Sequence, residues 1–230
     1  MLFRSSIRRN FLEETYEVLD AIDHDDAHGM CEELGDVLMQ VAFHAQIEAE
    51  RGRFTMADVV NGVAQKLVYR HPHVFGDVAV SGTGEVLSNW EALKRKEKGQ
   101  ATNTDALEAV ARALPALWRA EKVQKKARKA GFDWPDVSGA LDKLSEELEE
   151  LKTAAAEGTN VAEELGDLLF SAVNAARFLK VDPEDALNGA TDKFIGRFRK
   201  VEAQAAAQGK AMEDMGLEEL DALWERAKET

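Results

Sequence analysis

The chain has 230 residues, of which 45% are hydrophobic and 31% are charged, and its 43 acidic and 29 basic residues give a net charge of -14. This length can bury a substantial core, as one large domain or two small ones. The negative charge argues against binding to nucleic acid or to a membrane surface, because both need concentrated positive charge. No apolar run approaches the roughly 20 residues of a spanning helix, and residues 1–10 lack a signal-peptide core, so we expect a cytoplasmic protein.

The first part of the chain is predicted to be helical. Thr55 and Asp58 have the spacing of a capping box at a helix start, and Pro72 disfavours helix at the residue before it. The only β-like run, residues 78–80, is too short to build a sheet. Apolar residues recur three and four positions apart in two earlier stretches, as is typical of amphipathic helices: Leu12, Tyr16, Leu19 and Ile22, then Leu34, Val37, Leu38, Val41 and Ala45.

The second part continues the helical pattern after a polar stretch. Residues 99–104 (GQATNT) are a candidate linker between residues 1–98 and residues 105–230. Beyond it, apolar periodicity predicts helices over about 136–157 and 161–179. Asp182 followed by Pro183 then gives an N-cap with proline in the first turn. We therefore expect an all-α fold made of antiparallel helical hairpins.

The sequence contains an internal repeat. Four short motifs recur at nearly constant offsets of 133, 131, 127 and 134 residues. Offsets this similar indicate a tandem duplication, because loops absorb small differences in length. The matching segments are 13–17 with 146–150, 32–36 with 163–167, 66–70 with 193–197, and 90–94 with 224–228.

Each copy carries two pairs of carboxylates that are three residues apart on a helix. Such a pair shares one face, so an antiparallel helix pair would bring four carboxylates together. An isolated acidic pair is usually a solvated surface, yet here the loops between the helices have diverged and the carboxylates have not. Mg²⁺ would relieve the mutual repulsion of the carboxylates. The predicted metal clusters are Glu147, Glu150, Glu164 and Asp167, and in the first copy Glu14, Glu17, Glu33 and Asp36.

A pair of cations follows each acidic motif. Lys66 with Arg70, and Lys193 with Arg197, are four residues apart and share a helical face. No acidic residue lies four positions before either lysine to pair with it. Beside a metal cluster, such cations suit a polyphosphate, which needs both metal and hydrogen-bond donors.

Aromatic residues close each copy. Trp90 and Trp224 are either core residues or stacking walls beside Lys94 and Lys228, which lie four positions further on. Residues 131–134 (GFDW) either close a base pocket or staple the following helix. The sequence has neither a glycine-rich phosphate loop nor the Glu-x-x-His motif of di-iron bundles.

Together with KLVYRHPHVFGDV and GFDW, the repeated acidic motifs resemble the MazG family of nucleoside triphosphate pyrophosphohydrolases, over about residues 12–228. The resemblance implies an all-α homodimer built from two MazG-like repeats. It also implies Mg²⁺-dependent hydrolysis, with Mn²⁺ as a substitute, of NTPs and dNTPs to monophosphate and pyrophosphate, with broad base specificity. Two alternatives stay open: a narrower dUTP or dCTP diphosphatase of the same superfamily, and a helical regulatory protein without enzymatic activity.

The resemblance assigns catalysis to the C-terminal repeat, residues 105–230. Relatives carry a Cys-Pro-Trp-Asp segment before the first acidic motif, whereas this chain starts only twelve residues before Glu13. We therefore expect a truncated or misassigned start and a weakly active or structural first repeat. The four acidic residues of the second copy are the expected catalytic metal ligands. The expected substrate contacts are Lys143, Lys193, Arg197, Trp224 and Lys228, with Trp134, Lys66, Arg70 and Trp90 as further contacts.

Overall fold

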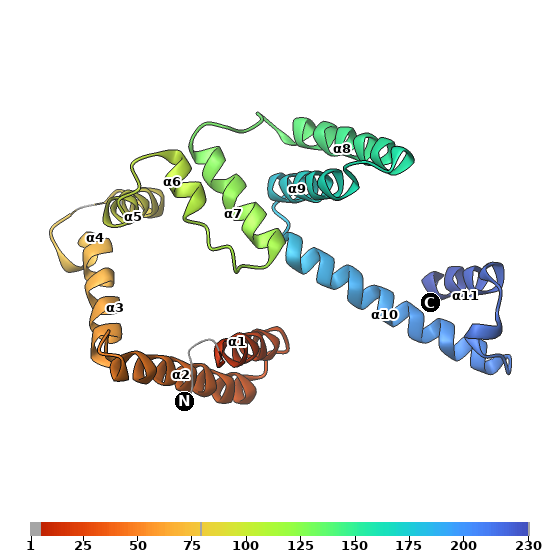
Figure 1. Cartoon of the computed structure of the whole chain (residues 1–230), viewed down its shortest axis with the longest axis horizontal. Helices are drawn as coiled ribbons and strands as arrows, with labels where there is room; N and C mark the ends of the chain where they lie inside the picture. The colour runs from red at the N-terminus through yellow and green to blue at the C-terminus, as the bar shows by residue number, and fades with distance from the viewer. Residues whose placement is uncertain (1–5, 79, 230) are drawn as a thin grey trace. The chain divides into compact units, whose positions relative to one another are not determined.

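The computed structural model describes residues 6–78 and 80–229, and every regular element in these residues is a helix. The all-α prediction is confirmed. The chain divides into two compact units, residues 1–99 and residues 100–230 (Figure 1). None of the described helices is both long enough and apolar enough to cross a membrane.

Unit 1 is a helical hairpin followed by three shorter helices. The first two helices pack along each other, the third packs against the second, and the fourth and fifth pack against the third. A three-residue turn joins the hairpin, and Asp26 in it caps the second helix by accepting hydrogen bonds from the backbone N–H groups of His28 and Gly29. The helices are α1 (Arg8–Asp23), α2 (Ala27–Glu50), α3 (Met56–Arg70), α4 (Pro72–Phe75) and α5 (Thr83–Glu97).

Unit 2 is built on a second long hairpin, α8–α9. Helix α7 packs on α9, and α10 begins beside both of them. Figure 1 shows that α10 then extends away from the hairpin and that α11 folds back onto its far part. The helices are α6 (Asn103–Glu108), α7 (Ala116–Lys129), α8 (Val137–Glu157), α9 (Val161–Leu179), α10 (Pro183–Ala207) and α11 (Leu217–Glu229), with a 3₁₀ turn at Met212–Asp214.

The predicted helix boundaries follow from capping side chains. Thr55 and Asp58 form the expected capping box at the start of α3, and Asp182 caps α10 with proline in its first turn. His71 separates α3 from α4, as the proline after it predicts. In the polar stretch expected as a linker, Thr102 makes a second capping box, so residues 103 and 104 already belong to α6.

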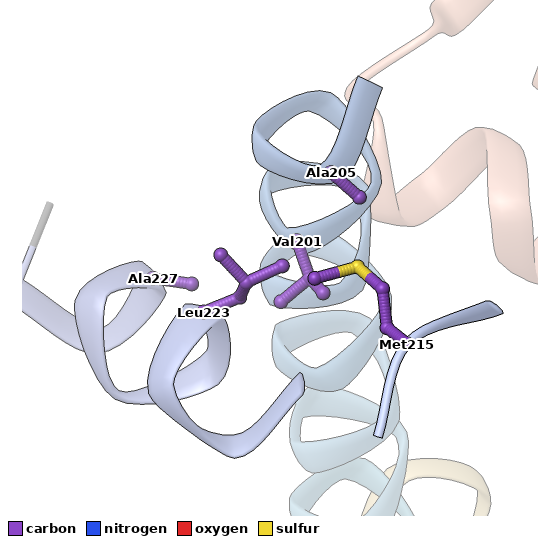
Figure 2. Close-up of a cluster of buried hydrophobic side chains, with 5 residues drawn as sticks. All are labelled: Val201, Ala205, Met215, Leu223 and Ala227. Atoms are coloured by element: carbon purple, nitrogen blue, oxygen red, sulfur yellow. The ribbon is translucent and has the colours of Figure 1, made fainter. Parts of the chain in front are cut away.

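The α10–α11 corner has a small hydrophobic core. Figure 2 shows Leu223 and Ala227 of α11 facing Val201 and Ala205 of α10, with Met215 beside them. These five side chains are all less than a tenth exposed. The core fixes the angle between α10 and α11, and therefore the position of the aromatic and basic residues they carry.

The long hairpins keep apolar surface exposed in a single chain. Large apolar residues of α1 and α2 are up to 61% exposed, and several in α9 and α10 are about half exposed. Exposed apolar side chains in this number are typical of a surface that a partner covers. Examples are Leu12, Tyr16, Ile22, Leu34 and Leu38 in unit 1, and Leu165, Leu169, Leu187, Phe194 and Ile195 in unit 2.

Candidate active site

The α8–α9 hairpin brings three of the predicted metal ligands together. Carboxylate oxygens of Glu147, Glu164 and Asp167 lie within 4.8 Å of one another. Glu147 comes from α8 and is buried, whereas the other two lie in the first two turns of α9. The Lys143 Nζ lies 2.7 Å from Oε1 of Glu147 and 2.8 Å from Oε1 of Glu146. This group supplies the oxygen ligands that a hard divalent cation prefers.

The fourth predicted ligand, Glu150, lies outside that closest group. Partial burial raises the pKa of Glu150, and the charges of Glu147 and Glu164 raise it further, while Lys143 opposes the shift. Glu150 is therefore within electrostatic reach of the group, although its oxygens are not within 4.8 Å of all the others. Desolvation is the largest cause of this raised pKa, and the neighbouring carboxylates add to it.

Unit 1 builds a similar acidic group from α1 and α2. Carboxylate oxygens of Glu14, Glu17 and Glu33 lie within 4.8 Å of one another, and Asp36 lies outside this set. Burial raises the pKa of Glu14, with further contributions from the charges of Asp36 and Glu17. Burial also raises the pKa of Glu33.

The two acidic groups differ in the side chain that supports them. The Gln40 Nε2 lies 3.4 Å from Oε1 of Glu14, so a neutral amide supports the first group. At the motif offset of 133, Lys143 of the second group corresponds to Asn10 in the first. Only the second group therefore has a cation at this position.

The predicted phosphate and base contacts of unit 2 lie on the α10–α11 corner. Arg197 is half-buried, and its Cζ lies 6.0 Å from the centre of the Trp224 ring. The ring of Phe194 lies 5.1 Å from that of Trp224, between centroids, and supports it. Lys193 is exposed one turn before Arg197, and Lys228 pairs with Glu225 on its own helix. The structure thus brings Arg197 and Trp224 together.

The acidic group and this corner lie apart within one chain. Asp167 is 12 residues before the end of α9, and Lys193 is 10 residues after the start of α10. At the helical rise these are axial distances of about 18 Å and about 15 Å. Because α10 extends away from the hairpin instead of returning along it (Figure 1), one chain does not join the two halves of the predicted site.

In unit 1 the corresponding arginine is already paired. Arg70 is buried, and its Nε and Nη2 lie 2.8 Å and 2.7 Å from the same carboxylate oxygen of Glu97. Two cations lie over the Trp90 ring: the Arg70 Cζ at 5.3 Å and the Lys94 Nζ at 4.6 Å from its centre. Lys66 is exposed one turn earlier. The first repeat thus keeps these residue types but engages them internally.

The GFDW segment anchors the start of α8. Arg177 donates from Nη1 and Nη2 to the two carboxylate oxygens of Asp133, at 2.9 Å and 2.5 Å, and Asn174 accepts from the same guanidinium. These hydrogen bonds hold the pKa of Asp133 below its usual range. A Cβ on Gly139 would lie 2.3 Å from the Trp134 ring, so the indole packs directly on the first turn of α8. This geometry matches the helix-stapling alternative.

Sequence reasoning missed Arg177, Asn174 and Glu97. The first two carried one usable signal, since they are polar residues inside the otherwise apolar run SAVNAARFL. Glu97 carried none, because it lies in the charged run KRKEK and pairs with a residue 27 positions away.

Residues 4–75 and 136–202 match the family model of the MazG nucleotide pyrophosphohydrolase domain. The chain belongs to the MazG family. Each matched segment holds one acidic hairpin and one Lys/Arg pair, so the tandem repeat of two MazG-like bundles is confirmed.

Relatives match over most of the chain. The nucleoside triphosphate pyrophosphohydrolase/pyrophosphatase MazG of Thermotoga maritima is 47% identical over 223 residues, which are 97% of this chain and 85% of that protein. The nucleoside triphosphate pyrophosphohydrolase of Escherichia coli K12 is 44% identical over 221 residues, 94% of this chain and 84% of its own length. The uncharacterized protein YabN of Bacillus subtilis is 48% identical over 98% of this chain and 46% of YabN.

Proposed function

We propose that this MazG-family protein hydrolyses nucleoside triphosphates to monophosphates and pyrophosphate, with the second repeat as the catalytic unit. The observation that carries the proposal is the group of Glu147, Glu164 and Asp167, which lies inside the second segment matched by the family model. Relatives that bear the name nucleoside triphosphate pyrophosphohydrolase support the reaction. Such a reaction would serve to clean or adjust the nucleotide pool of the cytoplasm.

The acidic group of unit 2 fits a divalent cation, and we assign it Mg²⁺, with Mn²⁺ as a substitute. All its donors are carboxylate oxygens. Desolvation and then the charge of Glu147 raise the pKa of Glu150, and a cation would relieve the repulsion between the carboxylates. Bound there, Mg²⁺ would offset the charge of the phosphates and make a water molecule more acidic. The ligands are Glu147, Glu150, Glu164 and Asp167.

The protein's own groups prepare this site for hydrolysis. The Lys143 ammonium holds the buried Glu147 carboxylate in place through their 2.7 Å contact. A carboxylate of the group would accept the proton of the attacking water, as a general base must lie within hydrogen-bonding reach of the reacting atom. Lys143 would also contact the substrate, since its cation lies at the edge of the acidic group.

The α10–α11 corner suits the triphosphate and the base. Lys193 and Arg197 would bind phosphate oxygens, with Lys228 at the end of α11 as a further cation. Trp224, supported by Phe194, would stack on the base. Stacking accepts every base because each has a π-face, so this corner favours broad specificity over a site restricted to dUTP or dCTP.

Because one chain separates the two halves, we propose that a second copy completes each site. The carboxylates of one protomer would work with the α10–α11 corner of its partner. The half-exposed apolar side chains of α9 and α10 support a homodimer, because an interface would bury them. A nucleic-acid partner is not expected for a chain of net charge -14.

We assign the first repeat, residues 1–98, a weakly active or structural role, with residues 99–104 joining it to residues 105–230. Its acidic group has Asn10 where the second has Lys143. Its arginine, Arg70, is paired with Glu97. Both differences remove positive charge from the place where a triphosphate would bind.

Product analysis tests the proposed function. The full chain is incubated with Mg²⁺ and, separately, with each of the NTPs and dNTPs, and the products are separated by anion exchange. Monophosphate plus pyrophosphate from all bases is the expected result. Diphosphate plus phosphate, or no turnover, would refute the proposal, and turnover of dUTP or dCTP alone would establish the narrower alternative.

A further inference from the structure

The ion pair between Arg70 and Glu97 joins the C-terminal ends of α3 and α5 in unit 1. Arg70 is the last residue of α3, and Glu97 is the last residue of α5. The Arg70 side chain is only 8% exposed, whereas the Glu97 side chain is 34% exposed. A carboxylate from the solvent side therefore reaches in to a buried guanidinium.

The corresponding arginine of unit 2, Arg197, has different neighbours. Within residues 6–78 and 80–229, Arg197 makes no ion pair, and its Cζ lies over the Trp224 ring at 6.0 Å from the ring centre. Arg70 and Arg197 close the same motif of the repeat, Lys-x-x-x-Arg. The two copies thus differ in whether the arginine already has an anionic partner.

We propose that the Glu97 carboxylate stands in for a substrate phosphate on Arg70 and closes a latent triphosphate site in the first repeat. Arginine binds carboxylate and phosphate oxygens through the same donors, so one anion excludes the other. The proposal rests on the proposed function, because it takes Arg197 and Trp224 as the model of an open site.

The surroundings of Trp90 agree with a closed site. Arg70 and Lys94 both lie over the indole, at 5.3 Å and 4.6 Å from its centre, where a base would have to stack. Among the described residues of unit 2, Arg197 is the one cation that lies over Trp224, at 6.0 Å, and the aromatic Phe194 flanks the ring. Lys66 remains exposed in the same motif, so one phosphate donor of the first repeat is still accessible.

Removing the charge of Glu97 should open the site. A buried guanidinium without a counter-ion is unfavourable, so Arg70 would take a free anion in its place. Glu97→Gln keeps the length and a hydrogen-bond acceptor of the side chain but removes its charge. Glu13→Gln is the matched control, because Glu13 also pairs with an arginine of unit 1, Arg9, at 2.8 Å, but at an exposed position.

The test counts nucleotide sites by calorimetry on the full chain with Mg²⁺ and an ATP analogue that has a methylene group between the α and β phosphorus atoms. Wild type and Glu13→Gln should bind one analogue per chain, and Glu97→Gln should bind two. In an Arg197→Ala background, the additional event should remain while the first is weakened by at least about tenfold.

Each outcome separates the inference from the proposed function. An unchanged count in folded Glu97→Gln would overturn the inference. If that variant unfolds, Glu97→Asp, which keeps the charge but withdraws it by one methylene group, should still show a weaker second event, and its absence would count equally against the inference. Undiminished binding in Arg197→Ala would instead overturn the substrate role of Arg197.

Discussion

The two repeats place the same residue types on corresponding helices, but these residues have different partners in each repeat. In both, three carboxylates from two helices have oxygens within 4.8 Å of one another. In the second repeat, Lys143 supports the acidic group and Arg197 is half-buried without an ion pair among the described residues. In the first, an asparagine replaces the lysine and Glu97 engages the arginine. Under the proposed roles of the two repeats, the carboxylates alone do not make a working site, since the cations must also be available to substrate.

The largest expected difference between the repeats concerns their carboxylates. Glu150→Gln should lower kcat/KM by about 100- to 1000-fold, the loss typical when one charge-stabilising group is removed from a site. Glu17→Gln makes the same chemical change in the first repeat and should alter kcat/KM by less than about twofold. Pyrophosphate release measures both, and circular dichroism should show unchanged helix content. Equal losses would mean that both repeats are catalytic.

In the second repeat, the ion pair between Asp133 and Arg177 holds the GFDW segment in place. The first repeat lacks this ion pair, because Gln46 stands at the position of Arg177 at the offset of 131. Asp133→Ala leaves the Arg177 guanidinium, whose side chain is 5% exposed, with Asn174 as its hydrogen-bond partner. The substitution should lower the free energy of unfolding, measured in urea, by about 3 kcal/mol. Arg128→Ala, which removes a 67% exposed partner of Asp133, should cost less than about 0.5 kcal/mol.

The Asp133 effect should also depend on pH. Since the folded-state pKa of Asp133 is lowered, its stabilising contribution is present above the ordinary carboxyl pKa of about 3.9 and is lost as pH falls through the folded value. The difference in unfolding free energy between wild type and Asp133→Ala should therefore shrink below about pH 4. A difference that stays constant down to pH 2 would mean that packing, not the ion pair, dominates.

Substitutions of the two arginines should have opposite signatures. Arg197→Ala should lower kcat/KM by about 10- to 100-fold with little change in stability, because it removes the proposed phosphate donor, which makes no ion pair with the described residues. Arg70→Ala should leave kcat/KM nearly unchanged and cost about 1 to 2 kcal/mol of stability, because it removes a buried ion pair. Paired assays of turnover and thermal unfolding distinguish the two. A catalytic loss from Arg70→Ala would contradict the structural role of the first repeat.

The smallest expected effect is the response of the acidic groups to metal. The raised pKa of Glu150 means that the folded state holds its proton more tightly, so metal-free stability falls as pH rises through the ordinary glutamate pKa and the raised one. At pH 7, Glu150→Gln should slightly raise the metal-free melting temperature and reduce the increase caused by Mg²⁺. Differential scanning fluorimetry with EDTA and then Mg²⁺ measures both, and equal Mg²⁺ shifts in the two proteins would exclude Glu150 from the metal site.

Much of this architecture could be predicted from the sequence because its signals are local. Capping residues such as Thr55 and Asp182 set helix starts, and apolar periodicity set α8 and α9 to within a residue. Convergence of the acidic pairs followed from the spacing of three residues and a short turn. Such signals describe a helix and its immediate neighbour.

Features that depend on how the helices pack in three dimensions could not be predicted from such local signals. Periodicity gives the faces of α10 but not its direction, so the course of α10 away from the α8–α9 hairpin appears only in the structure (Figure 1). The pairings of Arg70 with Glu97 and of Arg177 with Asp133 span 27 and 44 residues, far beyond the spacing of four considered for helical pairs. Glu150 lies outside the closest group because ideal helical spacing places a side chain on a face but does not fix the distance between its oxygens and those of its neighbours.

The central claim is that the working site combines carboxylates of one second repeat with the α10–α11 corner of another copy. Mixing Glu150→Gln with Arg197→Ala, each strongly impaired on its own, tests it directly, after exchange of protomers. Random exchange makes half of the dimers mixed, and each mixed dimer would hold one intact site of two, so activity should return to about a quarter of the wild-type value. Activity that stays at the level of the separate variants, with exchange verified by mass spectrometry, would show that each site lies within a single chain.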